Sequence, residues 1–182
     1  MKATETPFKG LVVLEPKVLG DSRGYFMESF NMRLLEELGL PANFVQDNQS
    51  FSTAGVLRGL HYQNAPHAQT KLVRVLYGRI NDVVVDLRIE EPTFGKSFSI
   101  ELSSDNKKQL YVPKGFAHGF VVLSETAEIL YKCDDFYSKQ SEGGIYFDDP
   151  ALQVDWGVSK DRIVLSEKDM ANPLLANATY FF

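Results

Sequence analysis

Three side chains in this chain of 182 residues could move protons at one site. His61 lies inside an apolar-leaning stretch, Lys71 heads a strand-like run ten residues later, and Tyr131 falls on the less charged face of another such run. A neutral imidazole can take a proton from a carbon next to a carbonyl group. A cation can stabilise the enolate oxygen that forms. A phenol on the opposite side can return a proton, which inverts the carbon.

Each of these residues also has an ordinary structural interpretation. A lone histidine is more often a hydrogen-bonded structural residue than a base, and a lysine is more often solvated. A buried tyrosine is more often a core residue whose hydroxyl has found a partner. The chemical interpretation therefore depends on all three side chains facing one cavity.

Strands are the elements that must position these side chains. Short runs of apolar, β-branched and aromatic residues alternate with turn sequences at a spacing typical of a sandwich or barrel. The sequence predicts an all-β fold, a double-stranded β-helix of the cupin or jelly-roll type with a few short helices. The strand-like runs cover 10–19 with an interruption at Pro16, 25–30 after a turn at 21–24, 56–63, 70–77, 80–89, 96–103, 109–113, 119–124 and 127–137.

The clearest helix is predicted over 31–41. Asn31 can cap its start, Gly39 can end it, and Pro41 prevents its continuation. Its expected apolar stripe consists of Leu34, Leu35 and Leu38. Short helical turns are predicted near 159–161 and 166–170 in a polar tail.

Composition indicates one globular domain, 1–182, rather than a disordered chain. Hydrophobic residues make up 44% and charged residues 24%. The net charge of −5 argues against non-specific binding to nucleic acid. A single cysteine, Cys133, suits a reducing compartment. No signal-peptide core and no apolar segment of about 18 residues is present, so we expect a cytoplasmic protein without membrane contact.

The spacing around His61 resembles the first motif of the cupin superfamily, and 113–118 resembles the second motif, Pro-x-Gly-x-x-His. In metal-binding cupins the first motif holds a second histidine and a glutamate, which ligate the metal. Here those two positions hold Gln63 and Lys71. A lysine ammonium repels a dication, and metal ligands must be deprotonated. The departures predict a cavity that uses neither metal nor cofactor.

Longer stretches resemble the dTDP-4-dehydrorhamnose 3,5-epimerase family of cupin-fold enzymes. The resemblance covers nearly the whole chain, and the pair "RGLHYQ" and "VPKGFAHGF" is specific to that family. It implies epimerisation of dTDP-4-dehydro-6-deoxy-D-glucose at carbons 3 and 5, in dTDP-rhamnose synthesis. The matching stretches are 21–30, 44–63, 69–88, 111–124 and 146–156.

The resemblance assigns four catalytic positions. His61 resembles the general base, Lys71 the enolate stabiliser and Tyr131 the acid that reprotonates from the other face. Asp169 resembles the carboxylate that orients the base, as in other histidine–acid pairs. From sequence alone, a surface acid in a polar tail is the better interpretation of Asp169.

The resemblance also assigns the nucleotide end of the site. Arg58 resembles the arginine that binds the diphosphate, for which a guanidinium is well suited. Strict alternation would put Arg58 and His61 on opposite faces, so we expect a bulge or an irregular start at Gly59. Tyr137 resembles the residue that stacks on thymine, and His118 a residue that shapes the cavity.

Further substrate contacts are expected from two other segments. Gln46 and Asn48 resemble polar contacts to the diphosphate or sugar. Arg23, Phe26 and Glu28 resemble residues that reach the nucleotide from a partner subunit, which implies a homodimer.

Three alternatives to this assignment remain open at this stage. A metal-dependent cupin oxygenase or isomerase is disfavoured by Gln63 and Lys71. A non-catalytic module that binds sugar nucleotides would not need Lys71 and Tyr131 to face His61. An epimerase that inverts only one carbon of a related dTDP-4-keto-6-deoxy sugar would share most of these residues.

Overall fold

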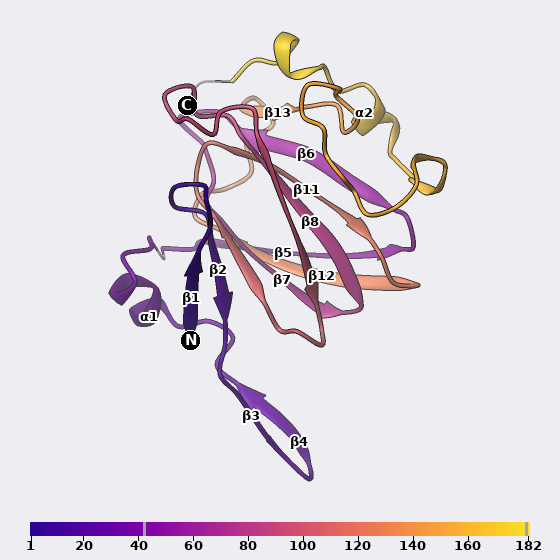
Figure 1. The fold of residues 1–182 in the computed structure, drawn as a ribbon. Helices are drawn as coiled ribbons and strands as arrows, with labels where there is room; N and C mark the ends of the chain where they lie inside the picture. The colour runs from indigo at the N-terminus through magenta and orange to yellow at the C-terminus, as the bar shows by residue number, and fades with distance from the viewer. Residues whose placement is uncertain (42, 181) are drawn as a thin grey trace.

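The computed structural model describes residues 1–41, 43–180 and 182, and most of its regular structure is β-strand (Figure 1). The helices are α1 (Met32–Glu37) and α2 (Glu167–Met170), with short 3₁₀ turns η1 (Lys160–Arg162) and η2 (Leu175–Asn177). The strands are β1 (Lys2–Glu5), β2 (Val12–Glu15), β3 (Val18–Asp21), β4 (Gly24–Met27), β5 (Gln46–Thr53), β6 (Leu57–Gln63), β7 (Lys71–Tyr77), β8 (Arg79–Asp86), β9 (Ser97–Ser103), β10 (Gln109–Val112), β11 (Phe116–Val122), β12 (Thr126–Cys133) and β13 (Glu142–Gly144).

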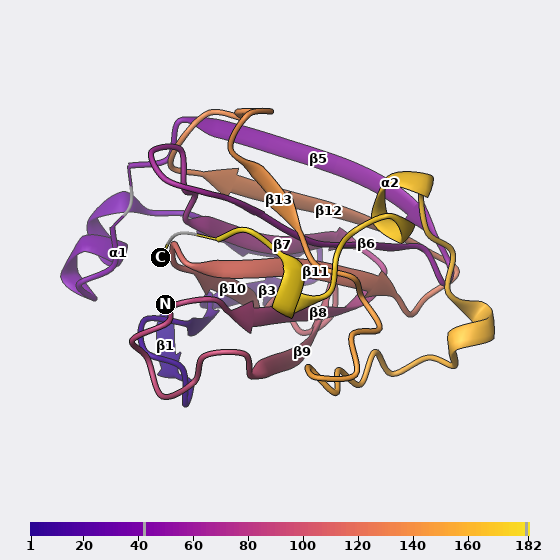
Figure 2. The same cartoon turned by 90° about the horizontal axis from the view of Figure 1, so that it is seen from above.

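Two antiparallel sheets form the body of the molecule. One has the order β1-β2-β10-β7-β12-β5 and the other the order β13-β6-β11-β8-β9 (Figures 1 and 2). From β5 to β8 the chain changes sheet at every step, and it does so again from β9 to β12. This confirms the predicted jelly roll. It also carries His61 on β6 and Lys71 on β7 to opposite sheets, although only ten positions separate them.

The hydrophobic core is continuous between the sheets at one end, and the cavity lies beside it. Val73, Ile129 and Val84 belong to this core and are fully buried. A second cluster, which includes Leu60 and Trp156, packs the C-terminal tail on the outer face of the five-stranded sheet. That sheet is therefore buried on both faces, and the tail that covers it brings α2 beside β6.

Helix α1 begins where the sequence predicts. The side chain of Asn31 accepts hydrogen bonds from the backbone N–H groups of Arg33 and Leu34, at 3.0 and 3.4 Å. The expected apolar stripe is wrong at one position. Leu38 is 42% exposed, whereas Leu40, beyond the helix end, is buried beside Leu35. The chain turns at Gly39, and the residue after that turn completes the apolar contact.

Three strands have no counterpart among the predicted runs. They are β1, β5 and β13, and each lies at the edge of its sheet. An edge strand exposes a row of unpaired backbone groups. The edge strand β5, "QDNQSFST", is largely polar, and its residues Gln46, Asn48 and Ser50 line cavities between the sheets. Another difference concerns β11, which begins at Phe116 rather than at Gly119 and so includes His118.

Among the residues that the structure describes, no helix is long and apolar enough to cross a membrane.

Candidate active site

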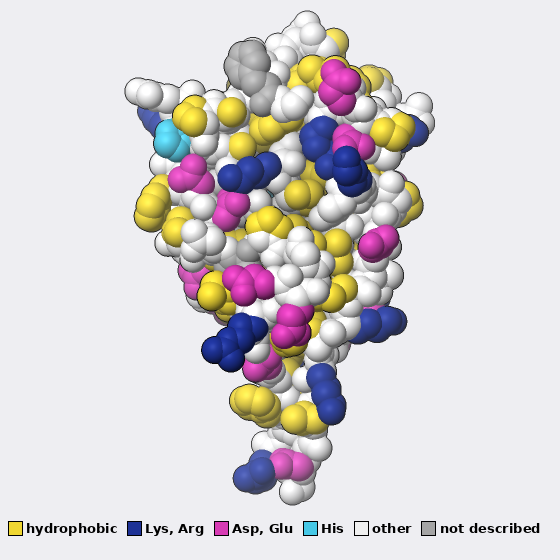
Figure 3. All heavy atoms as spheres, turned by 90° about the vertical axis from the view of Figure 1, so that its left-hand side faces the viewer, with side chains coloured by type: hydrophobic (Ala, Val, Ile, Leu, Met, Phe, Trp, Pro, Cys, Tyr) yellow, Lys and Arg dark blue, Asp and Glu magenta, His cyan; other side chains and the backbone are white. Residues whose placement is uncertain are grey.

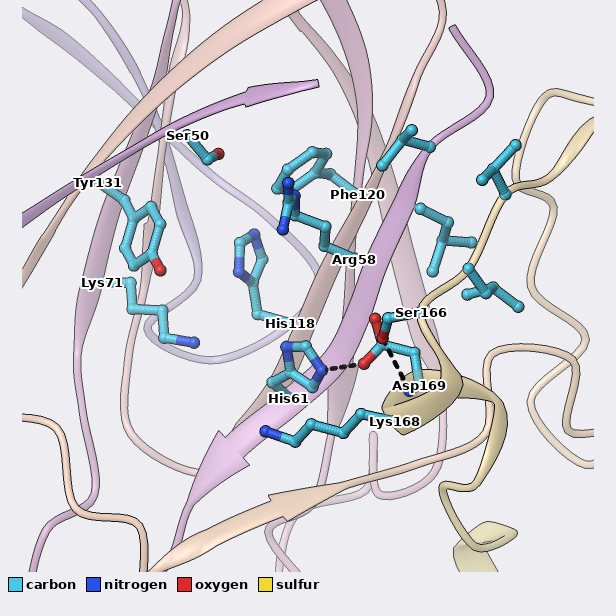
Figure 4. Close-up of a pocket in the computed structure, with 14 residues that line it drawn as sticks. Ser50, Arg58, His61, Lys71, His118, Phe120, Tyr131, Ser166, Lys168 and Asp169 are labelled. Atoms are coloured by element: carbon cyan, nitrogen blue, oxygen red, sulfur yellow. Dashed lines mark hydrogen bonds and ion pairs between the residues drawn. The ribbon is translucent and has the colours of Figure 1, made fainter. Parts of the chain in front are cut away.

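A cavity of about 500 Å³ opens between the two sheets (Figure 4). A smaller cavity of about 180 Å³ adjoins it, and His61, Lys71 and Tyr131 line both. The three side chains that suggested proton transfer therefore meet at the junction of the two spaces. His61 comes from the five-stranded sheet, while Lys71 and Tyr131 come from the six-stranded sheet that faces it.

His61 is held by a buried carboxylate. Its Nε2 lies 2.5 Å from Oδ1 of Asp169, which is 4% exposed on α2. Ser166 caps α2 by accepting the N–H of Asp169 at 3.1 Å. Burial works to raise the pKa of Asp169. The hydrogen bond and charge of His61, together with hydrogen bonds from Ser166 and Gly59, outweigh it, and the pKa lies below its ordinary value. A surface position for Asp169, which sequence alone favours, is therefore wrong.

Lys71 faces the cavity at the start of β7, opposite Cys133 in the neighbouring strand. No carboxylate of the described residues forms an ion pair with it. Burial lowers the pKa of its ammonium group, and electrostatic interactions with Cys133, Asp82 and Glu142 oppose that shift. The arrangement presents a cation with unused hydrogen-bond donors to any group that enters the cavity.

Tyr131 lies on the inner face of β12, as strand alternation predicts. Its neighbours on that face, Ile129 and Cys133, are fully buried. Burial raises the pKa of the Tyr131 phenol above its ordinary value, so the hydroxyl keeps its proton at neutral pH. Figure 4 shows Tyr131 and Lys71 on one wall of the cavity and His61 with Asp169 on the other. A base and a proton donor thus face each other across the space.

The expected irregularity at Gly59 is confirmed. In the β6–β11 pair, His61 lies opposite His118 and Arg58 opposite Phe120, so β6 holds one extra residue between these pairs. Gly59 has φ +140°, and a Cβ there would lie 2.5 Å from the Cα of Gly119. The extra residue brings Arg58 to the wall that carries His61, where its Nε donates to Ser52 at 3.1 Å.

The smaller cavity collects the predicted polar and aromatic contacts. Gln46 donates to Asn48 at 2.9 Å, and the Oε1 of Gln46 accepts the backbone N–H of Tyr137 at 3.2 Å. The hydroxyl of Tyr137 donates to Glu142 at 3.1 Å, and the residue is 57% exposed. The exposed ring beside a row of amide groups could receive a flat, polar base.

His118 forms a second buried histidine–carboxylate pair. Its Nε2 lies 2.9 and 3.0 Å from the two carboxylate oxygens of Asp82. Sequence reasoning named His118 but missed Asp82, although an acid within the apolar run 80–89 was a usable signal. It also missed Glu142 and Lys168, which line the cavities and pair with each other at 2.6 Å. Neither stands out in the sequence.

Three predicted contacts lie outside the cavity of this chain. Arg23, Phe26 and Glu28 belong to the β3–β4 hairpin and the segment after it. The hairpin projects from the body as a narrow arm (Figures 1 and 3). Phe26 is 69% exposed, and Arg23 pairs with Asp21 at 2.6 Å within the hairpin. Arg23, Phe26 and Glu28 therefore do not line either cavity of their own chain.

The donor set at the cupin ligand positions suits a metal poorly. Gln63 uses its side chain to bind the backbone of His67 and Ser138, at 2.7 Å in each case. Within residues 1–41, 43–180 and 182, no group of three or more His, Cys, Asp or Glu side chains could hold a metal ion.

Comparison with known proteins gives a consistent result. A family model described as dTDP-4-dehydrorhamnose 3,5-epimerase matches residues 5–177. The chain is 51% identical to the dTDP-4-dehydrorhamnose 3,5-epimerase of Pseudomonas aeruginosa over 182 residues, which covers 100% of this chain and 99% of that protein.

Solved structures extend the similarity to the fold. The dTDP-4-dehydrorhamnose 3,5-epimerase of Elizabethkingia anophelis superimposes with a TM-score of 0.94 at 54% identity, over 97% of each chain. A 3,5-epimerase of Legionella pneumophila in complex with dTDP-4-keto-L-rhamnose gives a TM-score of 0.92 at 48% identity, over 97% of this chain and 93% of that one.

Proposed function

The chain belongs to the dTDP-4-dehydrorhamnose 3,5-epimerase family, and we propose that its reaction takes place in the cavity between the two sheets. The enzyme inverts carbons 3 and 5 of dTDP-4-dehydro-6-deoxy-D-glucose and forms dTDP-4-dehydro-L-rhamnose. Both carbons flank the 4-keto group, which makes their protons acidic enough to be removed by a side chain. The work of the site is to remove a proton from one face and deliver one to the other.

His61 removes the proton. The C–H bond breaks, its proton moves to the imidazole, and its electron pair forms the carbon–carbon double bond of an enolate. Asp169 holds the ring in place and stabilises the imidazolium that results, at the 2.5 Å distance between Nε2 and Oδ1. Because the other ring nitrogen takes the proton, the Asp169 contact persists through the step.

Lys71 stabilises the enolate oxygen. Its ammonium has no carboxylate partner in the described chain, so its donors are available to the 4-keto oxygen. A fixed cation in a water-poor cavity acts more strongly than one in solvent and needs no reorganisation during the reaction. Binding the oxygen as charge develops on it lowers the barrier to proton removal.

Tyr131 returns a proton from the opposite face. Its phenol donates the proton to carbon, and the enolate collapses to the ketone. The phenolate then regains a proton from solvent, and the imidazolium of His61 releases its proton to solvent. The observation that carries this proposal is the placement of Tyr131 and His61 on facing sheets. If acid and base shared one wall, the proton would return to the face that lost it.

The nucleotide occupies the space beyond the reacting sugar. Arg58 binds the diphosphate, Gln46 and Asn48 contact the diphosphate or sugar, and Tyr137 stacks on thymine. His118 shapes the part of the cavity between them. The open second cavity and the exposed ring of Tyr137 support this placement.

A homodimer completes the nucleotide site. The hairpin carries Leu19, Tyr25 and Phe26 at 54%, 57% and 69% exposure, an unusual concentration of apolar surface on a narrow arm. In the dimer, Arg23, Phe26 and Glu28 of one subunit reach the nucleotide bound to the other. We also propose that residues 1–182 form a single domain and that the enzyme acts in the cytoplasm.

The experiment that tests this function counts deuterons in the product. The enzyme is incubated with dTDP-4-dehydro-6-deoxy-D-glucose in deuterated water, and the product is analysed by NMR. We expect a deuteron at each of carbons 3 and 5, with both centres inverted. Deuterium and inversion at one carbon only would instead identify a single-carbon epimerase.

A further inference from the structure

Asp82 is a buried carboxylate that the proposed reaction does not use. It lies on β8 with 0% exposure, and both of its oxygens face Nε2 of His118. No lysine or arginine of the described chain forms an ion pair with it. Burying a carboxylate is costly unless hydrogen bonds or nearby positive charge compensate it. One imidazole compensates only part of the desolvation cost, which points to a second electrostatic partner of Asp82.

The strand register explains how Asp82 reaches His118, which lines the cavity. In the β8–β11 pair, Asp82 lies opposite Phe120, and Val84 lies opposite His118. Asp82 and His118 are therefore diagonal neighbours on the inner face, a spacing that long side chains bridge. Figure 4 shows the ring of His118 between the wall of Lys71 and Tyr131 and the side chains of Arg58 and Phe120.

Two other carboxylates near the cavity each have a histidine or lysine partner. Asp169 is paired with His61, and Glu142 is paired with Lys168. Lys71 is a half-buried cation with no bonded carboxylate, and Asp82 is a buried carboxylate with no bonded lysine or arginine, among the residues that the structure describes. The negative charge of Asp82 acts on Lys71 and opposes the lowering of its pKa by burial. Their charges compensate each other without the direct contact that would occupy the donors of Lys71.

We propose that Asp82 is a positioning residue of the epimerisation: it fixes the ring of His118 and holds Lys71 in its charged form while leaving the ammonium available to substrate. The inference rests on the proposed function, because only enolate stabilisation requires a charged Lys71. A ring nitrogen that faces a carboxylate carries the proton. His118 is thereby set with Nε2 protonated, and its Nδ1 is left to accept a hydrogen bond.

The pH dependence follows from the groups that surround Lys71. Activity falls as pH rises through the pKa of Lys71, because the neutral amine stabilises an enolate poorly. Burial lowers that pKa, and the negative charge of Asp82 raises it. Removing the charge should move the alkaline limb of the pH profile to lower pH. The titratable groups that face Lys71 are Cys133 and Tyr131 on β12, Asp82 on β8, Glu142 on β13, His61 on β6 and His118 on β11.

Asp82→Asn tests the proposal, and Asp86→Asn is its matched control. Asp86 lies on the same strand, is equally buried, and pairs with Arg88 at 2.6 Å outside the cavity. For Asp82→Asn we expect kcat to fall about tenfold, less than the roughly 10²–10³-fold cost of deleting a direct oxyanion donor. The alkaline limb should move down by about one pH unit. Asp86→Asn should lower the melting temperature and leave kcat and the limb unchanged.

Two results would overturn the proposal. One is an Asp82→Asn enzyme whose kcat and alkaline limb match those of Asp86→Asn, which would make Asp82 merely structural. The other is a wild-type ¹⁵N-histidine spectrum at neutral pH with Nδ1 of His118 protonated and Nε2 bare, a measurement that needs no folded variant at Asp82. His67→Gln removes the resonances of the exposed histidine and so helps the assignment.

Failure of the proposed function would give a different result. If Lys71→Met kept wild-type activity, Lys71 would not be the enolate stabiliser, whatever Asp82 does. If Lys71→Met lost activity while Asp82→Asn behaved like its control, the proposed function would stand and the inference about Asp82 would fail.

Discussion

The cavity between the sheets and the β3–β4 hairpin carry two halves of the predicted site, and they differ in how complete they are. In the cavity, His61 has Asp169 at 2.5 Å, and Tyr131 faces it from the other sheet. On the hairpin, Phe26 is 69% exposed. Among the described residues, Arg23 forms an ion pair only with Asp21, two positions away in the same hairpin. One chain thus assembles the groups for chemistry, while the hairpin residues have no site of their own.

The difference follows from what each half must do. Proton transfer and enolate stabilisation depend on fixed geometry and exclusion of water, which the inside of a sheet sandwich provides. Nucleotide contacts contribute binding energy that is the same in the ground state and the transition state, so they can come from a second subunit. We therefore expect substitutions in the cavity to lower kcat and substitutions at the nucleotide end to raise KM.

The largest effect is expected for His61→Asn. Asparagine cannot accept the proton, and no other histidine shares its position, so proton abstraction should cease at both carbons. We expect kcat to fall by about 10²–10⁴-fold or more, the typical contribution of a general base. Wash-in of solvent deuterium into the substrate measures this step. Rapid exchange at either carbon in the variant would reveal another base.

Arg58→Ala should have a large effect on KM rather than on kcat. The guanidinium is expected to bind the diphosphate, which is remote from the reacting carbons, so its loss removes uniform binding. KM should rise about 10²-fold while kcat changes little. Steady-state kinetics separate the two parameters. An unchanged affinity for substrate would remove Arg58 from the nucleotide site and weaken the contrast between the two regions.

Phe26→Ala tests whether the hairpin reaches the nucleotide. A lost aromatic contact should raise KM by about tenfold, in line with the 1–3 kcal/mol typical of stacking on a base, and leave kcat unchanged. Ile89→Ala is the control, because Ile89 is also exposed, at 58%, but lies after β8. If the two variants had equal KM values, Phe26 would not contact the substrate. Sedimentation of the wild-type enzyme checks the dimer itself.

Chelation should have the smallest effect. Lys71 and Gln63 occupy the positions where metal-binding cupins hold ligands, so we expect exhaustive dialysis against a chelator to leave kcat unchanged. Activity that is lost on chelation and restored by a single metal would contradict the mechanism. Zinc-free and chelator-free buffers provide the controls.

Much of the fold could be predicted because alternation is a local property. The inner position of Tyr131 follows from the pattern of β12, and the irregularity at Gly59 follows from the need to bring Arg58 to the wall of His61. The polar edge strand β5 could not be found this way, because the apolar half of its pattern is missing. Because β5 was not predicted, the sequence did not show that Gln46 and Asn48 lie on a strand, although the resemblance named both residues.

Contacts between segments that are distant in the sequence could not be predicted either. Nothing near Asp169 in the sequence distinguishes it from a surface acid, and only the resemblance linked it to His61, 108 positions away. Asp82 illustrates the opposite case. A charged residue within a buried run is a local signal that the sequence shows. Its partner His118 lies on another strand, and neither segment by itself predicts that the two strands pair.

The most direct test of the account is the Tyr131→Phe enzyme, incubated with the 4-keto substrate in deuterated water and followed by NMR at carbon 5. The central claim is that base and acid act from facing sheets. Without the phenol, His61 and Lys71 should still form the enolate, and His61 should return a deuteron to its own face. We therefore predict continued exchange at carbon 5 with loss of inversion there. Inversion at the wild-type rate would make Tyr131 a core tyrosine, and simultaneous loss of exchange and inversion would show that it is needed to form the enolate.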